Sequence, residues 1–238
     1  MKKALLAVVT LALAAWPLNS VLADTKEQTR LQNCGVVLDE IMNVSDDIPS
    51  TLIDKAECVI VIPSVLKGGF IVGGAIGRGA MVCRSGEHFN GPWGTPLLIA
   101  LEGGSVGFQI GGEATDFVIL VMNNRGATAI LKDKVKLGAD LSAAAGPIGR
   151  DAAAESDVTL RAEMLTYSRS RGLFAGVSLE GSTLRPDTEG NEELYQKKID
   201  PSDIELKGVV PPPPASQKLL QTLTKFSPRN DSAADQLK

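Results

Sequence analysis

The segment formed by residues 68–112 constrains the fold most, because glycine recurs there singly and in pairs between short runs of Ile, Val, Leu and Phe. Glycine weakens a strand and gives it no side chain to pack. A chain that sets glycine among β-formers therefore needs tight turns, bulges, or a backbone that closely approaches another surface. Three interpretations follow: a phosphate-binding loop, a catalytic elbow, or the strands of a compact β domain that contacts a ligand or a membrane.

The motifs in this segment argue against the first two interpretations. Residues 103–107 match the Gly-x-Ser-x-Gly pattern of a hydrolase nucleophile elbow, but that chemistry needs a His after the Ser, and His88 precedes it. Residues 69–74 have the glycine spacing of a phosphate loop, but Ala75 stands where such a loop requires Lys. With one His and no Cys-x-x-Cys pattern, a metal site is not expected either. We therefore expect no enzymatic activity and no cofactor.

The N-terminus predicts export. Lys2 and Lys3 precede an apolar run at residues 4–15, and Ala23 ends a sequence typical of a signal-peptidase site. The alternative is a retained membrane anchor, but a proline and polar residues interrupt the apolar run, which is also short for a span. Residues 1–23 are thus predicted to be a Sec-type signal peptide cleaved after Ala23, which places the protein in the periplasm, where it could be peripheral to a membrane.

The composition limits the class of protein. The chain has 238 residues and a net charge of −4, which becomes more negative once Lys2 and Lys3 are removed. Nucleic-acid binders usually carry a concentrated basic patch, and this sequence shows none. Aromatic residues make up 4% of the chain, so the core must consist largely of Val, Ile, Leu and Ala. This length suits one well-buried domain.

The hydrophobic pattern predicts an α+β fold, with N-terminal helices followed by an antiparallel-rich, curled or barrel-like β-sheet with short helices. Helices are expected at residues 25–44, 50–56 and 127–132. Strands are expected at residues 58–62, 70–72, 80–84, 97–101, 106–110, 117–122, 137–144, 160–168 and 174–180. The domain is assigned to residues 24–205.

The composition changes after Leu206, where residues 211–214 are four consecutive prolines. Such a run favours an extended polyproline conformation. We interpret residues 206–238 as a Pro-rich linker and flexible tail, with one short amphipathic helix at 216–226, and expect them to be dispensable for folding. The run could also dock into an aromatic groove of a partner, although a stiff spacer is the preferred interpretation.

The three cysteines are Cys34, Cys58 and Cys83. In an oxidising compartment, one disulfide and one free thiol is the simplest arrangement. Cys58 and Cys83 lie in neighbouring apolar segments, which favours their pairing, while three buried thiols are the alternative.

Several cations stand beside glycine or at the ends of apolar runs, where backbone amides and a positive charge together suit an anionic head group. Large apolar side chains close to them could enter a membrane interface. The candidate lipid-binding residues are Lys67, Phe70, Arg78, Arg84, Trp93, Arg169, Arg171 and Phe174. For any one cation taken alone, an ordinary solvated surface is the alternative.

Several blocks of the sequence resemble, in order, those of the SYLF lipid-binding domain family. They are residues 56–63 (AECVIVIP), 67–74 (KGGFIVGG), 77–84 (GRGAMVCR), 93–96 (WGTP), 103–112 (GGSVGFQIGG), 116–122 (DFVILVM), 138–150 (GADLSAAAGPIGR), 167–181 (YSRSRGLFAGVSLEG) and 193–195 (ELY). The resemblance covers roughly residues 30–196. The chain departs from it at Gly94 and Thr95, which replace the more usual Ser-Ala.

The resemblance implies a non-enzymatic protein that binds phospholipid membranes. Eukaryotic members bind phosphoinositide-containing membranes, and some associate with actin. The secreted bacterial branch resembles this chain in its signal peptide, its single domain and its cysteines at the positions of Cys58 and Cys83, which supports their pairing. We therefore expect a periplasmic protein that binds anionic phospholipid head groups. The alternative is an envelope interaction protein that binds a protein partner through residues 209–226.

Overall fold

The structure, a computed structural model, describes residues 25–43, 48–68, 72–106, 113–149, 161–170 and 173–232. The predicted signal peptide lies outside these residues. The helices are α1 (Lys26–Met42), α2 (Ser50–Lys55), α3 (Asn124–Lys132), α5 (Thr188–Tyr195), α6 (Pro201–Glu205) and α7 (Gln217–Phe226), with a 3₁₀ turn, η1 (Pro214–Ser216). The strands are β1 (Cys58–Gly68), β2 (Val72–Cys83), β3 (Leu97–Val106), β4 (Glu113–Val121), β5 (Val135–Lys136), β6 (Ala143–Ala145), β7 (Met164–Ser170), β8 (Leu173–Gly176) and β9 (Ser182–Pro186).

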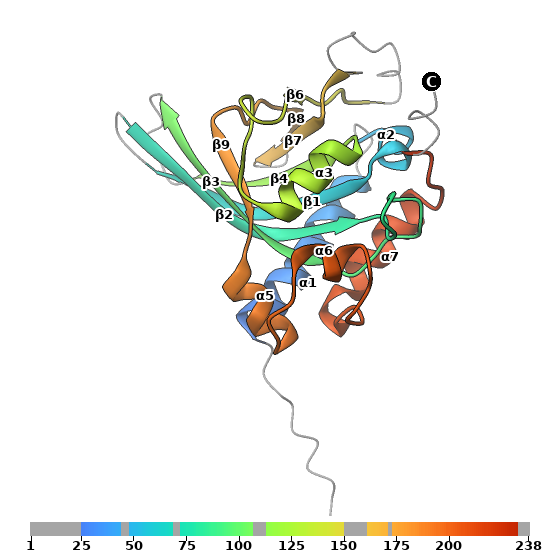
Figure 1. Ribbon diagram of the computed structural model, residues 1–238. Coiled ribbons are helices and arrows are strands. Elements are labelled where there is room, and N and C mark those ends of the chain that lie inside the picture. Colours follow the sequence, from blue (N-terminus) through green and yellow to red (C-terminus); the bar gives the residue numbers. More distant parts are fainter. Residues whose placement is uncertain are drawn as a thin grey trace, which may run out of the picture.

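These strands form a single sheet in the order β5-β9-β3-β2-β1-β4-β7-β6, with β8 paired to β7. Only the β6–β7 pair is parallel among the described strand pairs. The sheet curls strongly, with helices packed on both of its faces (Figure 1). The predicted α+β class, with N-terminal helices and a curled, antiparallel-rich sheet, is confirmed.

The sheet separates two hydrophobic cores, because side chains alternate between its faces. On one face, α1 and α7 cover residues such as Val61 and Ala80. On the other face, α3 and the segment around α6 cover residues such as Ile60 and Met81. Helix α1 begins with a capping box, in which the Thr25 hydroxyl accepts from the Gln28 N–H while the Gln28 side chain accepts from the Thr25 N–H.

Glycines in β2 allow a bulge in β1. The β1–β2 register shifts between Val61 and Leu66, and Ser64 in this bulge has a φ of 51°. A Cβ on Gly79 would lie 1.9 Å from the Val61 carbonyl oxygen, and one on Gly77 would lie 2.5 Å from the Val65 side chain. The expectation that glycines accommodate bulges and close backbone approach is confirmed at these two positions.

A disulfide joins Cys58 to Cys83, which are directly opposite in the β1–β2 ladder. The favoured pairing is therefore confirmed. Cys34 is free and buried in α1, and burial raises the pKa of its thiol to about 12. This thiol donates to the Val61 carbonyl at 3.4 Å, so it acts as a packed core side chain.

The segment after Leu206 differs from the expected linker and flexible tail, because residues 214–232 pack on the domain. Leu219 and Leu223 of α7 are each 1% exposed and belong to the core beneath α1. Gly35 of α1 lets α7 come close, since a Cβ there would lie 2.7 Å from the Leu219 backbone nitrogen. The predicted helix at 216–226 is present, but it is part of the core.

The predicted strands also differ in length from the observed ones. The runs at 58–62, 97–101 and 117–122 fall in longer strands. Strand β1 continues through a bulge to Gly68, β3 continues through two glycines to Val106, and β4 already begins at Glu113. The strand expected at 137–144 is wrong except for β6, because Gly138 adopts a φ of 82° and starts a turn. The strands expected at 70–72 and 106–110 lie mostly outside the described residues.

Candidate functional site

A cleft of about 250 Å³ lies where the first half of α1 faces the β1 bulge and β2. Helix α1 contributes Lys26, Thr29, Arg30 and Asn33, the bulge contributes Pro63 and Ser64, and β2 contributes Arg78. The lining therefore carries three cations from two elements. A cleft of this size can hold a group such as a phosphate with part of its substituent, but not a whole lipid.

The cations of this cleft are held in a defined ion network. Arg30, which is 8% exposed, binds Asp187 at 2.7 Å and Glu27 at 3.4 Å. The Arg78 side chain, which is 42% exposed, reaches the same Asp187 oxygen at 3.3 Å. Lys26 is 72% exposed and lies 3.8 Å from Glu27. Three cations thus face two carboxylates, so the cleft keeps an excess of positive charge, mostly on the more exposed Lys26 and Arg78.

An exposed apolar row lies next to the cleft on the same face of the sheet. Leu66 of β1 is paired with Ile76 of β2 and with Ala114 of β4. Leu66 is 63% exposed and Ile76 is 66% exposed, although both belong to the face that α1 covers further along the strands. Ile76 precedes Arg78 by two residues on β2, a distance of about 7 Å along a strand. An apolar surface therefore adjoins the cationic cleft.

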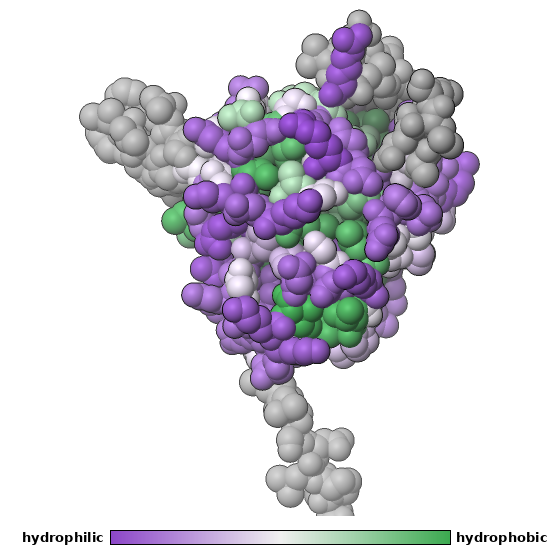
Figure 2. Space-filling view, viewed as in Figure 1, coloured by the Kyte–Doolittle hydropathy of each residue, from purple (hydrophilic) through white to green (hydrophobic). Residues whose placement is uncertain are grey.

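This row lies on the part of the sheet that extends beyond the helices. In Figure 1, β2 and β3 run past the body of the domain toward the upper left. Figure 2 shows apolar side chains at the left margin of the same region, next to hydrophilic residues of the body. The row is thus accessible to a flat partner, while the main cores are covered by helices.

Arg169, another predicted site residue, is engaged within the protein. It binds Asp116 at 2.8 Å and Glu40 at 2.7 Å. Burial acts to lower the pKa of Arg169, but the hydrogen bonds to both carboxylates outweigh it and the pKa is raised. Asp116 also accepts from the Ser64 N–H at 2.9 Å. Arg169 therefore supports the bulge beside the cleft, with its charge neutralised.

Arg84 and Trp93 lie together, but away from the cleft. Arg84 is 2% exposed, and its guanidinium lies 3.7 Å from the Trp93 ring centroid. It donates to the Ser227 hydroxyl at 2.8 Å and to the Arg229 carbonyl at 2.5 Å. Burial lowers the pKa of Arg84 to about 10. This cation is covered by the C-terminal segment and cannot contact a membrane surface in this structure.

Of the remaining candidates, one packs within the protein and three lie wholly or partly outside the described residues. Phe174 of β8 is half-buried and stacks on Tyr167, with ring centroids 5.5 Å apart. Phe70, Arg171 and the side chain of Lys67 lie outside the described residues, although the Lys67 backbone pairs with Ala75 and Glu113. Of the predicted cations, Arg78 alone is seen at the cleft among the described residues.

Sequence reasoning missed Lys26 and Arg30 of α1, as well as Asp187. The available signal was the spacing of Lys26, Thr29, Arg30 and Asn33, which places them on one side of a helix. The spacing alone does not tell which part of the sheet this side of the helix faces.

A family model described as "Las17-binding protein actin regulator" (Ysc84) matches residues 102–226. This match covers more than half of the 238 residues. The chain belongs to the Ysc84, or SYLF, family. The match runs through α7, beyond the predicted domain boundary at residue 205, in keeping with the packing of α7 on the domain.

Related proteins extend the SYLF similarity over most of the chain. SH3 domain-containing YSC84-like protein 1 of Homo sapiens is 38% identical over 193 residues, which is 80% of this chain and 54% of that protein. LAS seventeen-binding protein 3 of Saccharomyces cerevisiae is 33% identical over 208 residues, 86% of this chain and 44% of that protein. An SH3 domain-containing protein of Schizosaccharomyces pombe is 35% identical over 209 residues, with 86% and 47% covered. The chain thus spans about half the length of these relatives.

Two further properties bear on what this SYLF domain can do. Within the residues that the structure describes, no helix combines the length and apolarity needed to cross a bilayer. Over the same residues, no group of three or more His, Cys, Asp and Glu side chains is arranged to hold a metal ion.

Proposed function

We propose that this SYLF-family protein is a non-enzymatic, peripheral phospholipid-binding protein of the bacterial periplasm. Its cationic cleft receives the phosphate of an anionic head group, and the exposed apolar row enters the membrane interface. The observation that supports this most is the adjacency of Arg78 in the cleft to Ile76 in the row, two residues apart on one strand.

The combination is typical of interfacial binding. A cation near an anionic membrane surface contributes roughly 1 kcal/mol, and this contribution falls off within a Debye length. Leu66 and Ile76, which are mostly exposed in water, bury apolar area when they enter the interface. Because the chain carries a net charge of −4, which is more negative without Lys2 and Lys3, the local excess of cations must orient the protein with this surface toward the membrane.

The names of the relatives point to protein partners for those proteins, namely Las17, and to actin regulation. We do not transfer these partners to this chain, since a secreted bacterial protein would not meet them. What we propose for this chain is a lipid contact at the cleft and the row.

Vesicle co-sedimentation tests the proposal. The double variant Lys26→Gln with Arg78→Gln should bind anionic phosphatidylglycerol vesicles about thirtyfold more weakly, at roughly 1 kcal/mol for each cation. Arg30 still binds Asp187 in this variant, so folding should be retained. Wild-type binding should weaken as salt is raised and should be weak on neutral phosphatidylcholine vesicles.

The matched control is Lys132→Gln with Lys134→Gln, which removes the same charge from exposed positions at and just after α3, on the opposite face of the sheet. An equal loss of binding in both double variants would mean that only net charge matters, and the cleft would be rejected. No binding of the wild type to anionic vesicles would reject the proposed function as a whole.

A further inference from the structure

The proline run, residues 211–214, enters the 3₁₀ turn η1 through Pro213, which has an extended backbone. Pro213 has φ −67° and ψ 150°, which are polyproline II values. Proline fixes φ near −65°, and each residue before a proline is restricted to extended conformations. Pro211, Pro212 and Pro214 are exposed, while Pro213 is half-buried.

Hydrogen bonds fix the segment at both of its ends. The Thr95 hydroxyl donates to the Val210 carbonyl at 2.9 Å. The Ser216 N–H and hydroxyl both donate to the Pro213 carbonyl, at 2.9 and 2.7 Å. Ser216 is 1% exposed and leads directly into α7, whose inner side is buried against α1. The segment is therefore rigid before any partner binds.

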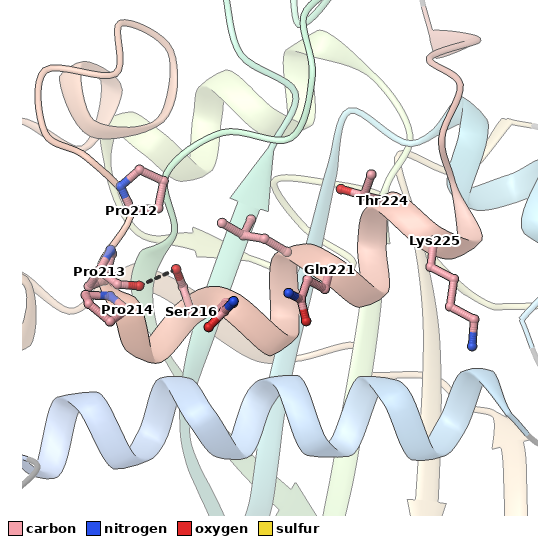
Figure 3. Close-up of a pocket in the computed structure, with 9 residues that line it drawn as sticks. Pro212, Pro213, Pro214, Ser216, Gln221, Thr224 and Lys225 are labelled. Carbon is pink, nitrogen blue, oxygen red and sulfur yellow. Dashed lines mark hydrogen bonds between the residues drawn. The ribbon is translucent and has the colours of Figure 1, made fainter.

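A groove of about 700 Å³ lies between the prolines and the outer side of α7. Figure 3 shows Pro212, Pro213 and Pro214 at one end of it and Thr224 and Lys225 at the other. Leu220 gives it an apolar wall, and Lys225 is the one charged residue in its lining. The Lys225 ammonium lies 3.5 Å from the Asn43 amide oxygen and 4.4 Å from the centroid of the Phe226 ring. Figure 2 shows an apolar area over α6 and α7, surrounded by hydrophilic residues.

We infer that this surface binds a protein module whose own groove is lined by aromatic side chains and has an acidic rim. Prolines offer flat apolar rings and no N–H donors, which suits stacking on aromatic rings. The preformed conformation lowers the entropy that binding must overcome. An aromatic side chain of the module occupies the groove beside Leu220, and a carboxylate of its rim meets Lys225. This activity is separate from the membrane contact, because α7 and the cleft are different parts of the molecule.

The probes are purified SH3, WW and EVH1 domains, which bind polyproline II ligands in aromatic grooves. Their binding to the full-length mature chain is measured by biolayer interferometry. At least one module should bind with a micromolar dissociation constant. The double variant Pro211→Ala with Pro212→Ala should weaken this binding at least about tenfold, a loss of about 1.4 kcal/mol. Lys225→Gln should weaken it about threefold at low salt and little at high salt.

Three controls make the test decisive. Pro92→Ala removes an exposed proline elsewhere and should leave binding unchanged. A free peptide of residues 207–218 should bind the same module more weakly than the folded chain, because it must lose conformational entropy and lacks the groove. Circular dichroism melting establishes that each variant is folded.

Any of three results would overturn the inference: no module binds at millimolar concentration, the proline variant binds like the wild type, or the peptide binds as tightly as the protein. A proline variant that loses vesicle binding while the modules ignore the wild type would instead assign the groove to a lipid chain. Failure of the vesicle experiment on the cleft variants leaves the module-binding result unaffected, since the two assays use different probes.

Discussion

The two ends of strands β1 and β2 lie in opposite environments. At one end, Cys58 and Cys83 are bridged, and the adjoining Arg84 is enclosed by Trp93 and the C-terminal segment. At the other end, the same two strands pass beyond α1 and expose Leu66 and Ile76. One end is covered and hydrogen-bonded, and the other presents apolar side chains to solvent.

Arg78 and Arg84 illustrate the difference. They are six residues apart in sequence and both stand beside glycine or an apolar run, so the sequence offers no reason to separate them. Yet Arg84 donates to Ser227, whose hydroxyl in turn donates to Asp54 at 2.7 Å, all within a buried cluster. Arg78 remains 42% exposed at the cleft. The covered end stabilises the domain, which leaves the exposed end free to carry the proposed binding surface.

The largest effect is expected from deleting the C-terminal segment that covers the bridged end of β1 and β2. A chain ending at Leu206 loses the buried Leu219 and Leu223 and leaves Arg84 and Asp54 without Ser227. Two buried leucines contribute roughly 1.5–3 kcal/mol each, and an unpaired buried charge costs about 3 kcal/mol more. This sum is comparable with the total stability of a domain, so the shortened chain should fail to fold cooperatively in thermal melting.

A chain that lacks only residues 233–238 serves as the control and should melt like the full-length protein. If the chain ending at Leu206 melts within a few degrees of the full-length protein, the distinction between a covered and an exposed end is wrong.

Removing the disulfide should give the next largest effect. The bridge closes a separation of 25 residues, for which chain entropy predicts a loss of about 3 kcal/mol in Cys58→Ser with Cys83→Ser. Urea unfolding at equilibrium measures the change. Vesicle binding of the folded variant should be unchanged, because the bridge is at the opposite end from Leu66 and Ile76. Loss of vesicle binding without loss of stability would contradict the separation of roles.

The pH dependence of stability tests Glu205, which lies beside the bridge. Its carboxylate is fully buried and accepts from the Cys83 N–H at 2.9 Å, and burial raises its pKa well above the usual value. The native state then binds more protons than the unfolded state above about pH 4.5, the unfolded value. The stability that protonated Glu205 contributes is thus full below about pH 4.5 and is lost as the pH rises toward the native pKa.

Glu205→Gln removes this titration. The unfolding free energy of this variant minus that of the wild type should increase with pH, by at most about 1.4 kcal/mol per pH unit. Urea titrations between pH 4.5 and 8 measure the difference. A difference that stays constant over this range would mean that Glu205 titrates normally, and that this end of the strands is more hydrated than the structure indicates.

The smallest change in stability is expected at the exposed end. Leu66→Ser with Ile76→Ser should alter the unfolding free energy by less than about 0.5 kcal/mol, as is usual for surface substitutions. The same variant should bind anionic vesicles much more weakly, because it cannot bury apolar area in the interface. Val209→Ser, at an apolar residue that is 51% exposed away from this row, is the control. Normal vesicle binding by the double variant would remove the row from the proposed site.

The fold class and the first two helices could be predicted from sequence because they depend on local periodicity and composition. The pairing of Cys58 with Cys83 was favoured by their apolar segments and supported by the family resemblance. The role of the C-terminal helix could not be predicted. Leu219 and Leu223 show helical spacing, but the surface that they cover includes Gly35, which in sequence only weakens a helix. The close approach of two helices at this glycine involves residues far apart in the chain, and no local pattern reports it.

The candidate site was predicted only in part for a similar reason. Arg78 could be named because glycines flank it. Its partner Asp187 and the cleft cations Lys26 and Arg30 come from segments that the folded sheet brings together. Conversely, Arg84 and Trp93 were named from their positions beside turns and apolar runs, but they are covered by residues 227–229.

The contact between α1 and α7 also has a consequence for the order in which the chain can fold. Lys218 of α7 binds Asp39 of α1 at 2.7 Å across 179 positions of sequence, so the core on this face cannot close until the chain through α7 is present. Contacts this distant are slow to form, because a long loop must close first. A nascent chain would therefore leave this face of the sheet without its full helical cover until α7 has been synthesised, which fits the export proposed above.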